Sequence, residues 1–210
     1  KMNFYITTPI YYTNDIPHIG HAYTTIACDI IARYNKLLGS EVFFLTGTDE
    51  HGQKVEKAAI NSNLNPKEFV DKLSANFINL VPFLGCEIDD FIRTTEDRHI
   101  KSAQELWKRL ENNNQIYLSN YEGWYSVRDE AFYQENELKK VDGKFLTNHG
   151  SPVEWVKEES YFFKLSQWQD KLIDYYEKNP GSILPKTRYN EVLSFIKGGL
   201  KDLSISRTTF

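Results

Sequence analysis

The sequence predicts an α/β fold, with a parallel sheet and flanking helices followed by a smaller inserted subdomain. Two observations predict this fold. Short runs of apolar and β-branched residues alternate with longer stretches that carry apolar residues at helical spacing. After residue 115 the pattern changes to aromatic, extended segments that glycine and proline interrupt. A chain of 210 residues is long enough for one large domain with an insertion.

The first strand–helix–strand unit covers residues 4–46. Residues 4–8 are uncharged, aromatic and β-branched, which predicts a buried strand, and residues 42–46 predict a second one. Between them, residues 22–38 carry apolar side chains at three-to-four spacing and predict a helix that Gly39 ends in a left-handed conformation. Such crossovers are right-handed and parallel, so the carboxyl ends of both strands, at Thr8 and Thr48, share one edge of the sheet. Ligands of open α/β sheets bind at that edge.

The later elements follow from the same patterns. Residues 53–61 continue as a helix, and a second helix opens with Asn65 as cap and Pro66 at its first position. A strand is predicted over 90–95 and a helix over 95–110. Beyond them we predict extended chain over 116–133, helices over 162–178 and 189–200, and a strand over 203–206. We assign 1–115 to the first half of the sheet domain, 116–200 to the insertion, and 201–210 to the start of a return to the sheet domain.

His18-Ile19-Gly20-His21 lies where the loop after the first strand meets the first helix. A helix N-terminus presents unpaired N–H groups and the positive end of the helix dipole, which together favour an anion. Two histidines three residues apart lie on one side of the first turn, and both can donate to phosphate oxygens that gain charge during displacement at phosphorus. Gly20 has no Cβ, so an adenine ring can approach the backbone. The alternative is an ordinary strand–helix turn with two surface histidines.

Composition limits the partners and the compartment. The net charge of −4 gives no overall basic surface, so a nucleic-acid partner needs a local patch. The two cysteines, Cys28 and Cys86, are too few for a disulfide framework and fit a reducing cytosol. No apolar run approaches the roughly 18 residues of a membrane span, and the first residues resemble no signal peptide. We therefore expect a cytoplasmic protein with no membrane partner.

Two long segments resemble a known family. Residues 5–21, which end in the histidine pair, and residues 44–54, Phe-Leu-Thr-Gly-Thr-Asp-Glu-His-Gly-Gln-Lys, are similar to the class I aminoacyl-tRNA synthetases. Among these they most resemble the methionyl-tRNA synthetases. The resemblance continues through residues 122–125, 154–155, 159–163 and 202–207, so it covers nearly the whole chain. It implies a Rossmann-like catalytic domain that activates methionine with ATP to methionyl-adenylate and transfers it to tRNA(Met).

The resemblance also implies roles for single residues. His18 and His21 are the expected catalytic pair, which stabilises the α-phosphate of ATP by position and electrostatics. The expected ATP-binding residues are His18, Gly20, His21, Tyr12 and Asn14, with Mg²⁺ accompanying ATP as substrate. The expected methionine-binding residues are Ile10, Tyr12 and Asp49, and Asp49 holds the α-amino group. From the residues alone, Ile10 and Tyr12 can equally be loop residues packed on the sheet edge, and Asn14 can be a turn former.

The insertion is predicted to bind no metal. In relatives it helps to position the acceptor end of the tRNA, and it often carries zinc knuckles with paired cysteines. Residues 141–155 contain no cysteine, and His149 alone cannot build a four-coordinate site, so we expect the zinc-free type. The aromatic residues of the insertion can stack on single-stranded RNA or form a small core.

The resemblance further implies a second half, with a lysine-rich loop that clamps pyrophosphate and an anticodon-binding domain. Neither occurs here, so we expect a truncated N-terminal portion that is inactive by itself. Synthetases for leucine, isoleucine and valine carry editing insertions much longer than the about 85 residues here. Two alternatives remain: a small nucleotidyltransferase with a similar histidine pair, which lacks the match at 46–52 and the aromatic insert, and a non-catalytic tRNA-binding fragment.

Overall fold

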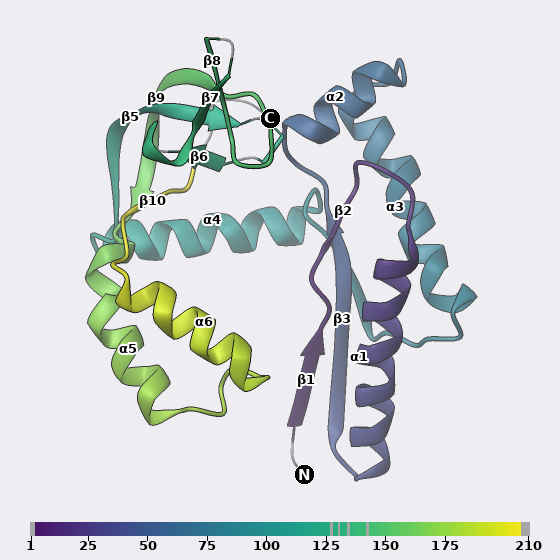
Figure 1. Ribbon diagram of the computed structural model, residues 1–210. Coiled ribbons are helices and arrows are strands. Elements are labelled where there is room, and N and C mark those ends of the chain that lie inside the picture. Colours follow the sequence, from purple (N-terminus) through teal and green to yellow (C-terminus); the bar gives the residue numbers. More distant parts are fainter. Residues whose placement is uncertain (1–2, 127, 130, 134, 142, 207–210) are drawn as a thin grey trace. The chain divides into compact units, whose positions relative to one another are not determined.

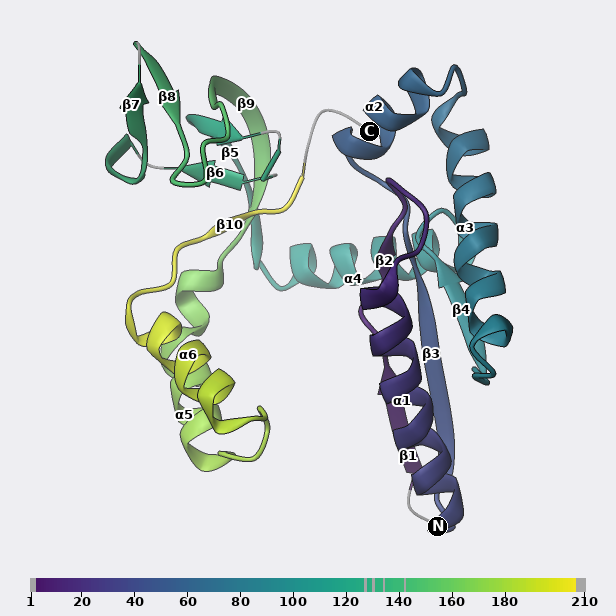
Figure 2. The same cartoon turned by 45° about the vertical axis from the view of Figure 1, so that its right-hand side comes forward.

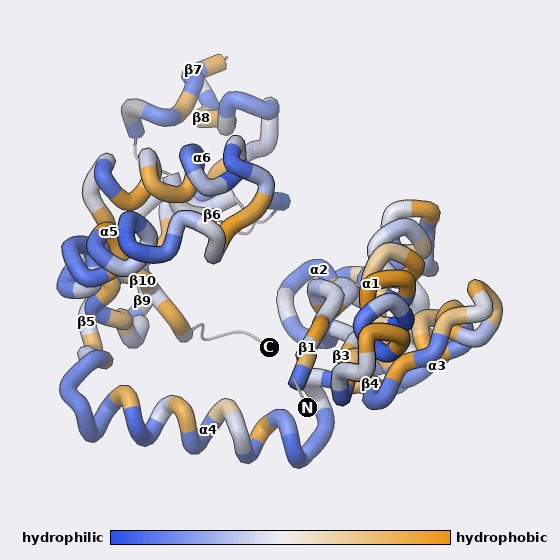
Figure 3. The backbone as a smooth tube through the Cα atoms, turned by 90° about the horizontal axis from the view of Figure 1, so that it is seen from below, coloured by the Kyte–Doolittle hydropathy of each residue, from blue (hydrophilic) through white to orange (hydrophobic). Residues whose placement is uncertain are grey.

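A computed structural model of the chain describes residues 3–206 apart from residues 127, 130, 134 and 142. The chain divides into two compact units, one that reaches to Glu105 and one that begins at Leu106, within helix α4 (Asp97–Asn112). Apolar positions recur along α4, as Figure 3 shows. The predicted division into 1–115, 116–200 and 201–210 stays a prediction, and residues 207–210 of its last part lie outside the described residues.

A parallel sheet centred on one long strand forms the first unit (Figure 1). Its strands are β1 (Asn3–Thr7), β2 (Tyr11–Tyr12), β3 (Glu41–Asp49) and β4 (Asp90–Arg93). β1 pairs with the first half of β3, and β2 pairs with the last two residues of β3. Thr48 pairs with both Tyr11 and Arg93, so β2 and β4 lie on opposite sides of β3. The parallel α/β sheet that the sequence predicts is therefore confirmed.

The first unit also contains three helices: α1 (Ile19–Leu37), α2 (Gln53–Asn61) and α3 (Pro66–Phe83). Helix α1 packs along β1 and β3, and α2 packs on α3 (Figures 1 and 2). Gly39 has a φ of +84° and follows α1 as predicted. Asn65 Oδ1 accepts from Glu68 N at 2.9 Å, which makes it the predicted cap of α3. No helix in the described part of the chain combines the length and the apolar content needed to cross a membrane.

The strand β3 extends three residues beyond its predicted end at residue 46. The extension is possible because Gly47 lets β4 approach closely. A Cβ at Gly47 would lie 2.0 Å from the backbone oxygen and 2.6 Å from Cγ2 of Ile92. The longer strand carries the backbone as far as Asp49 at the carboxyl edge of the sheet.

An antiparallel sheet of order β10-β9-β5-β6, a hairpin β7–β8 and two helices form the second unit. The elements are β5 (Ile116–Ser126), β6 (Ala131–Tyr133), β7 (Lys139–Val141), β8 (Lys144–Leu146), β9 (Glu154–Phe163), α5 (Gln169–Lys178), α6 (Lys186–Lys197) and β10 (Leu203–Ser204), with short 3₁₀ turns at Glu135–Glu137 and Leu165–Trp168. The prediction of a helix from residue 162 is wrong at its start. Phe162 lies in β9 and stacks on Tyr117 of β5 with 5.6 Å between ring centroids, so cross-strand packing decides its structure.

A single carboxylate joins several turns of the second unit. Asp129 accepts hydrogen bonds from Ser126 Oγ at 3.0 Å, Ser151 Oγ at 3.1 Å and Tyr133 OH at 3.2 Å. Burial acts to raise the pKa of Asp129, but these hydrogen bonds outweigh it and hold the pKa below its usual range. One carboxylate therefore links Ser126, Tyr133 and Ser151 within the second unit.

Replacing Gly47 by alanine should destabilise the first unit, because the added methyl group would overlap the backbone of Ile92. We expect Gly47→Ala to lower the free energy of unfolding by about 3 kcal/mol, the upper range for overpacking. Gly181→Ala is the matched control, since no atom lies within 4 Å of a Cβ there. Urea denaturation measures both variants, and equal stabilities would contradict the close approach of β4 to β3.

Candidate active site

The pairing of β2 with the end of β3 brings the predicted methionine-binding residues together. Tyr12 lies opposite Asp49 in the parallel ladder. Thr13 extends the ladder, because its backbone N–H and its Oγ1 both donate to the carbonyl of Asp49 at 3.1 Å. Ile10 lies directly before β2 and remains 43% exposed. The sequence did not predict β2, although its position at the carboxyl edge agrees with the predicted place of the site.

The two histidines close the first turn of α1 by a reciprocal pair of hydrogen bonds. His18 Nδ1 accepts from Gly20 N at 3.0 Å, and His21 Nδ1 accepts from His18 N at 3.0 Å. The ring centroids lie 3.9 Å apart. Because both Nδ1 atoms accept from backbone N–H groups, each neutral ring carries its proton on Nε2. The start of α1 therefore presents two Nε2–H donors where the helix dipole also favours an anion.

Gly20 has a local function that the sequence did not reveal. A Cβ at this position would lie 2.9 Å from Cε1 and 3.0 Å from Nδ1 of His18. The missing side chain thus leaves room for the His18 ring to fold back over the first turn. The close approach of adenine to Gly20, expected from the sequence, stays a prediction.

Two aromatic side chains pack against the ring of His21. Its ring lies edge-on to Tyr11 at 4.8 Å and to Phe77 of α3 at 5.1 Å between centroids. Tyr11 is buried, and its hydroxyl lies 2.7 Å from Thr25 Oγ1 of α1. Burial first, and the nearby charge of His18 second, lower the pKa of His21. The surroundings of His21 therefore favour the neutral ring.

The last predicted site residue, Asn14, lies on the loop between β2 and α1. Asn14 is exposed on that loop, where its neighbour Asp15 accepts from Ile16 N at 2.7 Å in a local turn. Lys54 at the start of α2 places its Nζ 5.8 Å from the ring centroid of Tyr12. The structure thus gathers the segments 10–14, 18–21 and 49–54 at one edge of the sheet, as the topology predicts.

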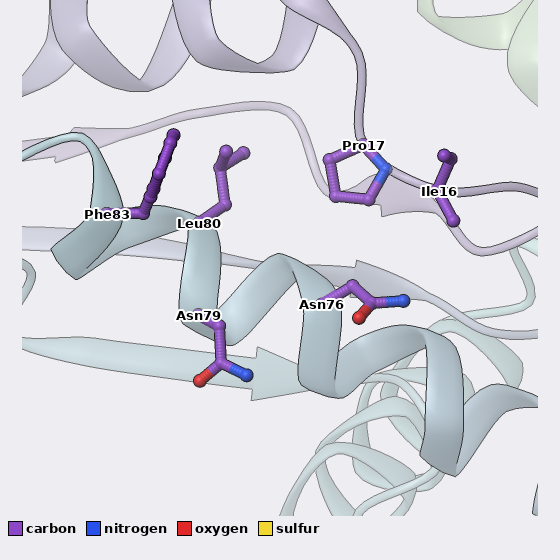
Figure 4. Close-up of a pocket in the computed structure, with 6 residues that line it drawn as sticks. All are labelled: Ile16, Pro17, Asn76, Asn79, Leu80 and Phe83. Atoms are coloured by element: carbon purple, nitrogen blue, oxygen red, sulfur yellow. The ribbon is translucent and has the colours of Figure 1, made fainter.

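An open pocket of about 440 Å³ lies beside the histidine turn (Figure 4). Ile16 and Pro17 form one side, and α3 forms the other with Asn76, Asn79, Leu80 and Phe83. None of the predicted site residues lines this pocket. Within the described residues, no group of three or more His, Cys, Asp or Glu side chains is placed to hold a metal ion.

Both the sequence and the fold match known proteins. Residues 4–210 match the family model described as tRNA synthetases class I (M). The chain therefore belongs to the class I tRNA synthetases, and its curated relatives are methionine–tRNA ligases. That of Rickettsia prowazekii is 61% identical over 210 residues, and that of Rhizobium meliloti is 56% identical over 208 residues. All of this chain matches the first relative and 99% of it matches the second, but the match spans only 41% and 40% of their lengths.

Solved structures agree with this assignment. Methionyl-tRNA synthetase of Mycobacterium tuberculosis in complex with methionyl-adenylate superposes with a TM-score of 0.95 at 49% identity. The superposition covers the whole of this chain and 42% of the other chain. The free form of the same enzyme superposes with a TM-score of 0.79 at 46% identity, over the whole of this chain and 40% of the other.

We expect His21 to titrate below the ordinary histidine value of 6.5. The unfolded chain then binds more protons than the folded chain between 6.5 and the lowered pKa. The stability that neutral His21 contributes is complete above pH 6.5 and is lost as the pH falls through its folded pKa. NMR titration of the Cε1 proton measures the midpoint.

The variant His18→Asn separates the two causes of this shift. Asparagine keeps a capping side chain but removes the neighbouring charge. The midpoint of His21 should rise only part of the way to 6.5, because burial is the larger cause. A wild-type midpoint at or above 6.5 would contradict the buried environment of the ring.

Proposed function

We propose that the full-length protein containing this chain is a methionine–tRNA ligase. It forms methionyl-adenylate from methionine and ATP and transfers the methionyl group to tRNA(Met). The observation that carries the proposal is the fit of the whole chain to a methionyl-tRNA synthetase in complex with methionyl-adenylate. The chain spans about 41% of the length of its curated relatives, so the activity is proposed for the whole protein.

The histidine turn would act on the α-phosphate of ATP. The methionine carboxylate attacks this phosphorus, pyrophosphate leaves, and the phosphoryl oxygens gain charge in the transition state. His18 and His21 each offer an Nε2–H donor that the backbone already orients, so little reorganisation is needed during reaction. Neutral rings whose Nδ1 atoms are already bonded are donors rather than general bases. Mg²⁺ accompanies the phosphates of ATP as part of the substrate.

Methionine would bind beside Tyr12 and Asp49, the last paired residues of β2 and β3. Asp49 would hold the ammonium group by a charge-assisted hydrogen bond. Ile10 and Tyr12 would contact the thioether side chain, which is polarisable and suits apolar and aromatic walls. The support for this assignment is that Tyr12 and Asp49 are direct ladder partners at the edge that also carries the histidines. Tyr12 and Asn14 would also contact ATP.

The second unit would meet the acceptor end of tRNA(Met). The family match covers this unit as well as the first one, which favours a synthetase over the small nucleotidyltransferase considered from the sequence. A location in the cytoplasm, the lack of a membrane partner and the inactivity of residues 1–210 by themselves stay predictions.

Methionine-dependent exchange of labelled pyrophosphate into ATP tests the function and the role of Asp49 together. The full-length wild-type protein should show exchange with methionine and not with leucine. Asp49→Asn should raise KM for methionine about 10- to 100-fold and leave KM for ATP nearly unchanged, as expected when a hydrogen bond to a charged group is lost. Glu41→Gln, at the exposed start of the same strand, should behave as wild type. Wild-type methionine kinetics in Asp49→Asn would show that another group holds the ammonium.

Protein purified without added metal should contain far less than one zinc ion per chain. Residues 141–155 supply no thiolate, and Thr147 and Ser151 are both buried there. Elemental analysis by inductively coupled plasma mass spectrometry measures the content. A stoichiometric amount of zinc, retained after dialysis against a chelator, would contradict the metal-free insertion.

A further inference from the structure

Glu50, which directly follows Asp49, is a fully buried carboxylate that the proposed reaction does not use. Its side chain has 0% exposure. Oε1 accepts from Thr48 Oγ1 at 2.8 Å and Arg93 Nε at 2.7 Å, and Oε2 accepts from Arg93 Nη2 at 3.0 Å and from Thr95 Oγ1. Both oxygens therefore have two donors each, and the charge has a bidentate partner. Burying a carboxylate is unfavourable without such compensation.

The ion pair of Glu50 and Arg93 is extended by a residue of helix α3. Arg93 Nη2 also donates to Asp71 Oδ1 of α3 at 2.5 Å, and Lys67 Nζ lies 3.1 Å from the other oxygen of Asp71. Glu50 follows β3 and Arg93 ends β4, so one guanidinium joins the ends of two strands and a helix. A planar guanidinium with several fixed donors is suited to hold such a geometry.

The backbone around Asp49 is bonded on both sides. On one side its carbonyl accepts from Thr13, as described above. On the other side Glu50 N donates to Thr94 Oγ1 at 2.9 Å, and His51 Nε2 lies 3.3 Å from Thr94 O. Three successive residues, Arg93, Thr94 and Thr95, thus bond the Glu50 carboxylate, the Glu50 N–H and the ring of His51. Any movement of this stretch would move the main chain that carries Asp49.

We propose that Glu50 and Arg93 are positioning residues, which fix the Asp49 carboxylate and thereby set the affinity for the amino acid. This inference rests on the proposed function of Asp49. The pair lies at the end of β3 that carries Asp49, since Arg93 is the ladder partner of Thr48. The same strand offers the comparison: Arg98 holds Asp90, at the opposite end of β4, by bonds of 2.5 and 3.0 Å. That pair has the same bidentate chemistry and no predicted site residue beside it.

The test compares matched changes at the two arginines in the full-length protein. Arg93→Lys keeps the charge and loses the bidentate geometry, and Arg98→Lys makes the same change at the far end of the strand. Arg93→Lys should raise KM for methionine about tenfold or more in the exchange assay, because small displacements of a binding group cost one to two orders of magnitude. KM for ATP should change less than about twofold. Arg98→Lys should leave both constants at their wild-type values.

A second pair of variants keeps the test decisive if Arg93→Lys does not fold. Thr95→Val removes one donor to Glu50 Oε2 without changing the side-chain volume much, and Thr95→Ser keeps the hydroxyl. Thr95→Val should raise KM for methionine several-fold, and Thr95→Ser should restore it. Unchanged methionine constants in Thr95→Val, or equal changes for methionine and ATP, would overturn the positioning role. Wild-type protein without methionine-dependent exchange would instead overturn the proposed function on which it rests.

Discussion

The parallel pairing of β2 with the last two residues of β3 is the interaction on which the site depends. It consists of two ladder positions and the additional bonds from Thr13 to the carbonyl of Asp49. Through it the chain after β1 stays beside β3 instead of leaving the sheet. The same short segment places Tyr11 against His21 on one side and Tyr12 opposite Asp49 on the other. One backbone contact therefore sets the relative positions of the histidine turn and the acidic strand end.

Much of the first unit was predictable because its signals are local. Apolar strands, a helix with a regular stripe and the rule for parallel crossovers were sufficient to predict the parallel sheet and a candidate site at its carboxyl edge. Strand β2 escaped prediction because two residues give no measurable periodicity. Phe162 was assigned to a helix because an aromatic pair at the end of a strand fits either period, and only its partner Tyr117, 45 positions away, decides between them.

The roles of single residues were harder to predict than the elements. Histidine is not among the preferred capping residues, so nothing in the sequence indicated that His18 and His21 would close their own helix turn. The sequence predicts that Gly20 leaves room for an adenine ring, whereas in the structure a Cβ at Gly20 would meet the His18 ring. Asp49 and Glu50 are chemically similar neighbours, yet one is half-buried and the other is enclosed. Their difference comes from Arg93, a partner far along the chain that no local pattern indicates.

The reciprocal capping of α1 has a consequence for how the site attracts an anion. A proton on Nδ1 of His21 would face the backbone N–H of His18, so the hydrogen bond that closes the turn requires the neutral His21 ring that burial favours. The neutral His21 ring offers an anion an oriented Nε2–H dipole, whose attraction is short-ranged. Attraction between full charges extends about 8–10 Å and weakens as salt is added. Attraction of an anion to the neutral His21 ring therefore depends on contact geometry more than on ionic strength.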